Sequence, residues 1–148
     1  MFKVGGIFIP VTDIEKSTDW YVKFLGARII DSWGEGVGFY LPEGTAQLAL
    51  VKVESPQPTE FTIKGSRKNS YYNFVVDDID MAHQHFKNND IPTTEIDDLG
   101  GMKFFDFFDL DGNPFSVVNE VEGSPYHSDN IREMQERDKK NKLIFDNK

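Results

Sequence analysis

Residues 104–120, Phe104-Phe-Asp-Phe-Phe-Asp-Leu-Asp-Gly-Asn-Pro-Phe-Ser-Val-Val-Asn-Glu120, decide the fold of this chain. Aromatic and β-branched residues stand on both sides of the cluster Asp109-Leu-Asp-Gly-Asn113. This composition is typical of two β-strands joined by a turn that needs side-chain capping and a positive φ. Pro114 then opens the second strand, where a missing N–H is tolerated. The stretch therefore predicts a β-hairpin.

The rest of the chain contains two copies of one pattern, a strand and a helix followed by three short strands. In the first copy a helix begins after Thr12 or Asp13 and ends at Gly26, and strands are predicted at 4–11, 27–31, 36–41 and 46–53. In the second copy a helix begins at Asp78, and strands are predicted at 70–76, 91–95, 103–108 and 114–120. Placing Asp78 on Asp13 aligns the copies at an offset of 65 residues, which indicates an internal repeat.

These motifs resemble one known family. The motif Asp109-x-Asp-Gly-Asn113, with Val11-Thr-Asp-Ile-Glu15 and Val76-Asp-Asp-Ile-Asp80 opening the two helices, is similar to the vicinal oxygen chelate superfamily. That superfamily contains glyoxalase I, extradiol dioxygenases, fosfomycin-resistance enzymes and bleomycin-resistance proteins, and it usually has Pro in place of Leu110. The resemblance covers residues 4–120. It implies an α+β fold in which two βαβββ units form a cup-shaped mixed sheet with helices on the outer face.

A single domain is expected over residues 1–120, with unit one at 1–53, a polar linker at 54–69 and unit two at 70–120. Residues 121–148 form a C-terminal tail that permits a helix. Its apolar stripe has only Ile131 and Met134 before Leu143-Ile-Phe145. Three interpretations of the tail remain open: a frayed end, a helix laid over the domain, or a helix packed on a second subunit.

Composition and charge exclude several classes of function. The 148-residue chain has no cysteine, which excludes disulfide frameworks, thiolate metal sites and cysteine nucleophiles. Its net charge is −9, and residues 1–120 carry all of it because the tail is neutral. Nucleic acid is therefore not expected as a partner. The negative charge either keeps the domain soluble or favours a cationic ligand through its long-range field. No apolar run or signal-peptide pattern predicts membrane insertion, so the expected location is the cytoplasm.

Alternate residues of a strand face opposite sides of its sheet, so each strand should have one face toward the helices and one concave face. The helix-facing side should be apolar, and five pairs meet that requirement: Ile7 and Ile9, Leu48 and Leu50, Tyr72 and Phe74, Phe105 and Phe107, Phe115 and Val117. The concave face then receives Gly6, Phe8, Gln47, Ala49, Tyr71, Asn73, Phe104, Asp106, Pro114 and Ser116. The resemblance places the ligand pocket on this face.

Enzymes of the superfamily hold a divalent metal at four positions, one on the first strand and one on the last strand of each unit. Counting from the helix starts and the β-turn assigns these positions to Gly6, Ala49, Tyr71 and Ser116. Gly and Ala have no ligand atoms, Ser is a poor neutral ligand, and a Tyr phenol normally stays protonated. We therefore expect no metal and no other cofactor.

Asp106 is predicted to lie beside Phe104, Tyr71 and Phe39, where burial would make an unpaired carboxylate costly. One interpretation is a structural polar network in which Tyr71, Asn73 or Ser116 satisfies the carboxylate. The other is that the carboxylate receives a cationic or hydrogen-bond-donating ligand. No partner nucleophile or oxyanion donor is visible, so no catalytic residue is predicted.

Three functions follow from these observations. The first is a metal-free protein that binds a small, cationic or aromatic molecule, as in the bleomycin-resistance branch, through Phe8, Phe39, Gln47, Tyr71, Asn73, Phe104, Asp106 and Ser116. The second is a metal-dependent lyase or dioxygenase with a displaced metal site, because a one-residue slip in strand register would reverse every face assignment. The third is a scaffold that acts through its tail. Many relatives form dimers across their units, so a homodimer is expected.

Overall fold

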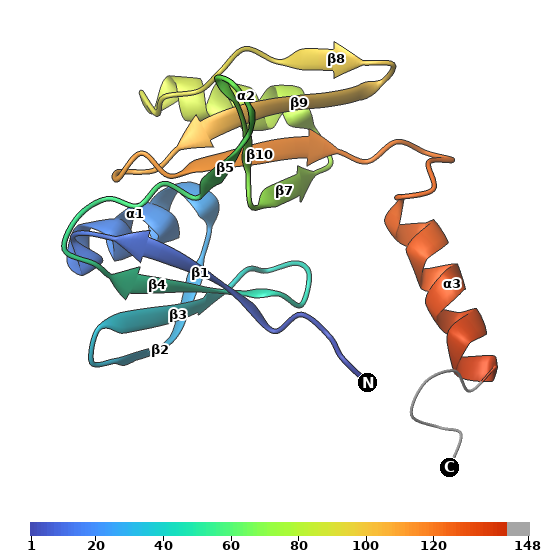
Figure 1. The fold of residues 1–148 in the computed structure, drawn as a ribbon, viewed down its shortest axis with the longest axis horizontal. Coiled ribbons are helices and arrows are strands. Elements are labelled where there is room, and N and C mark those ends of the chain that lie inside the picture. Colours follow the sequence, from blue (N-terminus) through green and yellow to red (C-terminus); the bar gives the residue numbers. More distant parts are fainter. Residues whose placement is uncertain (142–148) are drawn as a thin grey trace.

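The computed structural model describes residues 1–141 and contains two βαβββ units (Figure 1). Unit one consists of β1 (Gly6–Val11), α1 (Ile14–Leu25), β2 (Arg28–Trp33), β3 (Gly36–Tyr40) and β4 (Gln47–Lys52). Unit two consists of β7 (Asn73–Val76), α2 (Ile79–Asn88), β8 (Asp97–Leu99), β9 (Met102–Phe108) and β10 (Pro114–Asn119). The two sheets have the equivalent orders β1-β4-β3-β2 and β7-β10-β9-β8, which confirms the predicted α+β class.

The register of the strands repeats between the units. In each unit the first strand runs parallel to the last, and the remaining pairs are antiparallel. Phe8 stands opposite Ala49 in unit one, and Asn73 stands opposite Ser116 in unit two. Asn73 lies at the predicted 65-residue offset from Phe8, whereas Ser116 follows Ala49 by 67 residues, so the strand pairing repeats with two more residues between the first and last strands of unit two.

Equivalent aspartates begin the two helices. The Asp13 carboxylate accepts a hydrogen bond from the Lys16 N–H at 3.1 Å, and the Asp78 carboxylate accepts one from the Met81 N–H at 3.0 Å. Each bond satisfies a backbone donor that the first turn of a helix leaves without an intrahelical partner. Gly26 ends α1 with a φ of +67°, a conformation that glycine adopts without a steric cost.

Two sequence predictions about strands are corrected by the structure. The predicted linker contains a hairpin, β5 (Glu60–Lys64) and β6 (Arg67–Ser70), whose turn uses Gly65 at a φ of +59°. Polar residues on both strands explain why the sequence pattern did not predict this hairpin. The predicted strand at 91–95 forms only the single pairing Thr93 with Phe107, and the edge strand is β8 instead. Pro92 explains the difference, because it lacks the N–H that a regular ladder requires.

The core lies between the helices and the helix-facing sides of both sheets. Seven of the predicted helix-facing residues are buried: Ile9, Leu48, Leu50, Phe105, Phe107, Phe115 and Val117. The other three, Ile7, Tyr72 and Phe74, pack against them while partly exposed. The Phe107 ring lies 4.4 Å from the Phe86 ring of α2 and 6.3 Å from the Trp20 ring of α1, centre to centre. A single aromatic cluster thus joins the two units.

The turn between β9 and β10 fastens unit two to unit one. The Asp109 carboxylate accepts hydrogen bonds from the Tyr21 hydroxyl of α1 at 2.6 Å and from the N–H groups of Asp111 and Asn113, both at 2.9 Å. The Asn113 side-chain amide donates to the Pro10 carbonyl at 2.8 Å. The capping role and the positive φ expected for this turn are both present, since Gly112 has a φ of +77°.

Tyr21 and Asp109, which form the central hydrogen bond of this junction, are both buried. Burial raises the pKa of Tyr21 well above its ordinary value, and the neighbouring charge of Asp109 adds to the shift. Burial also raises the pKa of Asp109, although hydrogen bonds from Tyr21 and Asn113 oppose that shift. A neutral phenol therefore donates to a partly desolvated carboxylate at the seam between the units.

The tail forms α3 (Ser128–Lys140), and none of its described residues is buried. Figure 1 shows this helix standing away from both sheets. The apolar residues predicted at Leu143–Phe145 lie outside the described residues. None of the helices within residues 1–141 is long and apolar enough to span a membrane.

Candidate functional site

A cavity of about 860 Å³ lies on the concave face of unit two. Its floor comes from the concave residues of β7, β9 and β10, and its walls come from β6 and from residues 121–127 of the tail. Four predicted ligand-binding residues line it: Tyr71, Asn73, Phe104 and Ser116. Tyr71 is 58% exposed, and its ring centre lies 5.6 Å from that of Phe61 on β5. The cavity therefore combines exposed aromatic faces with amide and hydroxyl groups and with the charged side chains of Arg67 and Glu120.

Asp106 lies beside this cavity rather than in its lining. The Ser116 hydroxyl donates to the Asp106 carboxylate at 2.7 Å, and the Asp106 N–H donates to the Thr94 hydroxyl at 2.8 Å. Ser116 is one of the three partners that the sequence suggested for a structural network. Ser116 therefore has two roles, since it lines the cavity and satisfies Asp106.

Phe8 and Gln47 belong to the concave face of unit one and do not line the cavity of unit two. Phe8 is 64% exposed, and the Tyr72 hydroxyl donates to its carbonyl at 3.5 Å, so it lies at the seam between the sheets. Gln47 stands opposite Gly6 at the start of β4. The predicted site is thus divided between two neighbouring faces.

The prediction that Phe39 lies on the concave face beside Asp106 is wrong. Phe39 pairs with Leu48, a helix-facing residue, so its ring points to the helix side of the sheet. It is fully buried, and its ring centre lies 6.5 Å from that of Tyr21. Phe39 is a core residue, and it cannot stand beside Asp106 on the concave face.

Trp33 is an aromatic residue of the concave face that the face assignment missed. It stands opposite Gly36, and a Cβ atom added at Gly36 would lie 2.1 Å from the indole ring. The ring therefore lies over a glycine floor, with Gly38 also nearby, and it remains 51% exposed. The alternating glycines of Trp33-Gly-Glu-Gly-Val-Gly38 were the available signal, because glycines on one face leave room for a flat side chain.

The tail wall of the cavity is held by Glu120 at the end of β10. The Glu120 carboxylate accepts a hydrogen bond from the Ser128 hydroxyl at 2.9 Å and lies 3.3 Å from His127 Nε2. His127 Nδ1 accepts from the Asp129 N–H at 3.1 Å, which assigns the ring proton of the neutral form to Nε2. These contacts place Tyr126 and His127 in the cavity lining.

The residues at the four metal positions do not fit a divalent ion. Gly6 and Ala49 offer no donor atom, Ser116 already binds Asp106, and Tyr71 offers only a phenol. Within residues 1–141, no group of three or more His, Cys, Asp or Glu side chains is arranged to hold a metal. His83 and His85 face the Thr94 and Phe24 carbonyls, each at 2.9 Å, outside the concave cavity.

Comparisons with known proteins agree with the observed fold of two βαβββ units. The family model of the Glyoxalase/Bleomycin resistance protein/Dioxygenase superfamily matches residues 3–117. A member of that superfamily from Sphaerobacter thermophilus is 25% identical with a TM-score of 0.65, over 81% of this chain and 98% of that one. No curated protein matches the chain.

Two further solved structures share the fold at lower identity. The fosfomycin resistance protein FosX from Listeria monocytogenes is 15% identical with a TM-score of 0.67, over 82% of this chain and 96% of that one. TnmS3, an antibiotic binding protein from Streptomyces sp. CB03234, is 17% identical with a TM-score of 0.64, over 82% of this chain and 98% of that one.

Proposed function

The chain belongs to the glyoxalase/bleomycin resistance protein/dioxygenase superfamily, and on this premise we propose that it binds a small cationic, aromatic molecule without a metal. The observation that carries the proposal is the concave cavity of unit two. It presents aromatic rings, amides and hydroxyls in the place where the superfamily's metal donors are replaced by Tyr71 and Ser116. The proposed ligand contacts are Tyr71, Asn73, Phe104 and Ser116, with Asp106 positioning Ser116.

Aromatic faces and charge favour a cation. An organic cation over a Tyr or Trp face gains about 0.5–2 kcal/mol, more when the site is dry. Tyr71 and Tyr126 supply such faces in the cavity, and Phe8 and Trp33 supply others on unit one. The net charge of −9 adds a long-range field that attracts cations, while the lining itself is balanced between Glu120 and Arg67.

One wall of this cavity comes from the tail, outside the residues that match the family model. The family match ends at residue 117, before Glu120 and the segment that Glu120 holds. Tyr126 and His127 therefore distinguish this cavity from the matched part of the superfamily fold. We propose that they contribute to ligand choice.

We also propose that the chain forms a homodimer. Superfamily members bind small molecules and often form dimers. Phe8 and Trp33 leave large apolar surface exposed on unit one, which a second copy would cover. Sedimentation at several concentrations tests for the homodimer, and a monomer throughout would contradict this part.

A pair of flat probes with opposite charge tests the binding function. Calorimetry in the presence of a chelator should give saturable binding of 3,6-diaminoacridinium and much weaker binding of anthracene-9-carboxylate. Tyr71→Ala should weaken the cation about tenfold through the lost ring face. Met81→Ala is the matched control, because Met81 is 70% exposed on α2 and outside the cavity.

Two results would contradict the proposal. Equal affinity for both probes would show that the site does not select cations. Binding that appears only when Mn²⁺, Zn²⁺ or Fe²⁺ replaces the chelator would favour a metal-dependent lyase or dioxygenase instead.

A further inference from the structure

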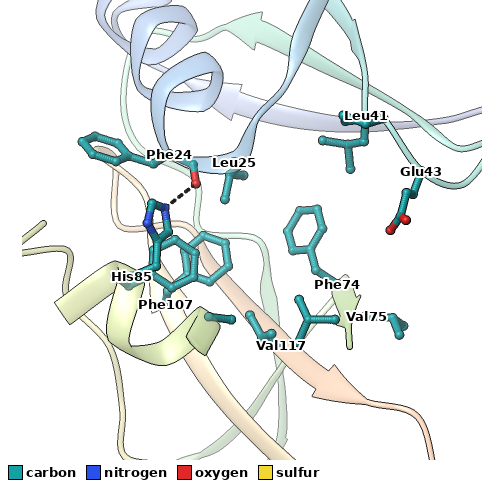
Figure 2. A pocket seen from close by; sticks show the side chains of 13 residues that line it. Phe24, Leu25, Leu41, Glu43, Phe74, Val75, His85, Phe107 and Val117 are labelled. Atoms are coloured by element: carbon teal, nitrogen blue, oxygen red, sulfur yellow. Dashed lines mark hydrogen bonds between the residues drawn. The ribbon is translucent and has the colours of Figure 1, made fainter. Parts of the chain in front are cut away.

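A second cavity, of about 450 Å³, lies between the two units on the helix side of the sheets. Unit one contributes the end of α1, with Phe24 and Leu25, and the loop after β3, with Leu41 and Glu43. Unit two contributes residues of β7, α2, β9 and β10. Figure 2 shows Leu41 and Glu43 facing Phe74 and Val75 across an open space.

The walls of this cavity are apolar. Phe74, Phe107 and Val117 are helix-facing residues that continue into the core, and Phe24 and Leu41 are only partly buried. The space is open to solvent at the exposed residues Glu43 and Val75. A space of this volume falls within the range of small-molecule sites, which are mostly apolar with a few polar groups.

Two polar side chains stand at opposite ends of the cavity. His85 Nε2 lies 2.9 Å from the Phe24 carbonyl, so the His85 ring links α2 to the end of α1 and forms part of the wall (Figure 2). Glu43 carries the single formal charge among the described lining residues, and its loop is exposed. Lys23 lies outside the lining at the other end, 5.2 Å from the centre of the Phe24 ring.

We propose that this cavity is a second ligand site, which binds a compact molecule with a one- or two-ring apolar body and one positive charge. The ring body lies between the units, where it covers Phe24, Phe74 and Phe107 and removes apolar surface from water. The positive charge lies at Glu43, at the solvent end. The site is distinct from the concave cavity, with which it shares only the edge residue Val75 among the described residues.

Biphenyl-4-ylmethylammonium and biphenyl-4-carboxylate, which differ mainly in the sign of their charge, are the probes. Calorimetry at low ionic strength should show the cation binding about threefold more tightly than the anion, because one partly exposed charge pair contributes little free energy. Glu43→Gln should remove that preference while leaving the apolar part of the affinity. The substitution lies on an exposed loop, so it should not disturb the fold.

Ala82→Phe tests the location, since Ala82 lines the cavity from α2 and an added ring would fill it. Both probes should lose at least about tenfold in affinity. Met81→Phe adds the same ring one residue earlier, at a position that is 70% exposed and outside the cavity, and should leave both affinities unchanged. Tyr71→Ala, on the concave face, should also leave biphenyl binding unchanged.

The inference is overturned if the wild-type chain binds neither probe, if it binds both with equal affinity, or if Glu43→Gln keeps the preference. It is also overturned if Tyr71→Ala removes biphenyl binding, because the probe would then lie in the concave cavity. Failure of the acridinium titration would contradict only the proposal for the concave cavity. The two proposals can therefore fail separately.

Discussion

The two βαβββ units share strand order, register and helix caps, yet their concave faces differ. Unit one presents an open surface where the Trp33 ring lies over Gly36. Unit two is enclosed by β6 and the tail, which make a cavity of about 860 Å³. The repeat is thus preserved on the helix-facing side, where residues are buried in one core, and it diverges on the concave side, where we propose the metal-free ligand site.

The connections between the last two strands differ as well. In unit two, residues 109–113 form a turn whose buried Asp109 and Asn113 side chains bind α1 and β1 of unit one. In unit one, the connection at 41–46 is mostly exposed and contains Glu43. Equivalent positions therefore have a structural role in one unit and a surface role in the other.

Removing the Asp109 carboxylate should produce the largest effect. Asp109→Ala leaves the Tyr21 hydroxyl, the Asn113 amide and two backbone N–H groups without their acceptor. We expect a loss of about 3–4 kcal/mol in the free energy of unfolding by urea. Glu43→Ala, in the equivalent connection of unit one, should change stability by less than about 0.5 kcal/mol. Equal effects of the two substitutions would remove the contrast between the units.

Tyr21→Phe tests the role of the unit-two turn through the pH dependence of stability. The folded-state pKa of Tyr21 lies above the unfolded value of about 10, so the neutral phenol contributes stability that is fully present below pH ~10. That contribution is lost as pH rises toward the folded-state pKa. Tyr21→Phe should cost about 1–3 kcal/mol at pH 7, because Asp109 loses a donor, and should lack this alkaline decline. Parallel declines of both proteins between pH 9 and 11 in urea titrations would contradict the assignment.

A methyl group on the concave face of unit one should displace Trp33. Gly36→Ala places a Cβ atom within 2.1 Å of the indole, so the ring must move into water at a cost of about 1 kcal/mol. The fluorescence emission of Trp33 should shift to longer wavelength. Gly38→Ala is the control, because its Cβ atom would make only ordinary contacts at 3.9 Å. Unchanged emission in Gly36→Ala would mean that the ring does not rest on this glycine.

Deleting residues 128–148 should have the smallest effect on folding. No described residue of α3 is buried, so the free energy of unfolding should change by less than about 0.5 kcal/mol. The concave cavity would lose the Ser128 bond that holds its wall, and acridinium binding should weaken. A large loss of stability without a change in binding would place the tail in the folding unit instead.

The sequence predicted the features that depend on periodicity and local chemistry. Asp13 and Asp78 cap helices, Gly112 has the expected positive φ, and the alternation of Phe104 to Phe108 separates core from concave residues. Phe39 was misassigned because the register of an internal strand depends on its partners in the sheet, which a short run such as 36–41 does not reveal. The contribution of Glu120 and His127 was missed because it depends on where the tail turns, a long-range feature.

Elemental analysis of the untagged protein, purified without chelator, tests whether the chain holds a metal. We expect Zn, Mn, Fe and Ni contents far below one atom per chain, because Gly6, Ala49, Tyr71 and Ser116 do not provide a divalent donor set. A near-stoichiometric content of any of these metals would contradict this expectation. The metal would then have to be bound at a displaced site, and the chain would be a candidate lyase or dioxygenase.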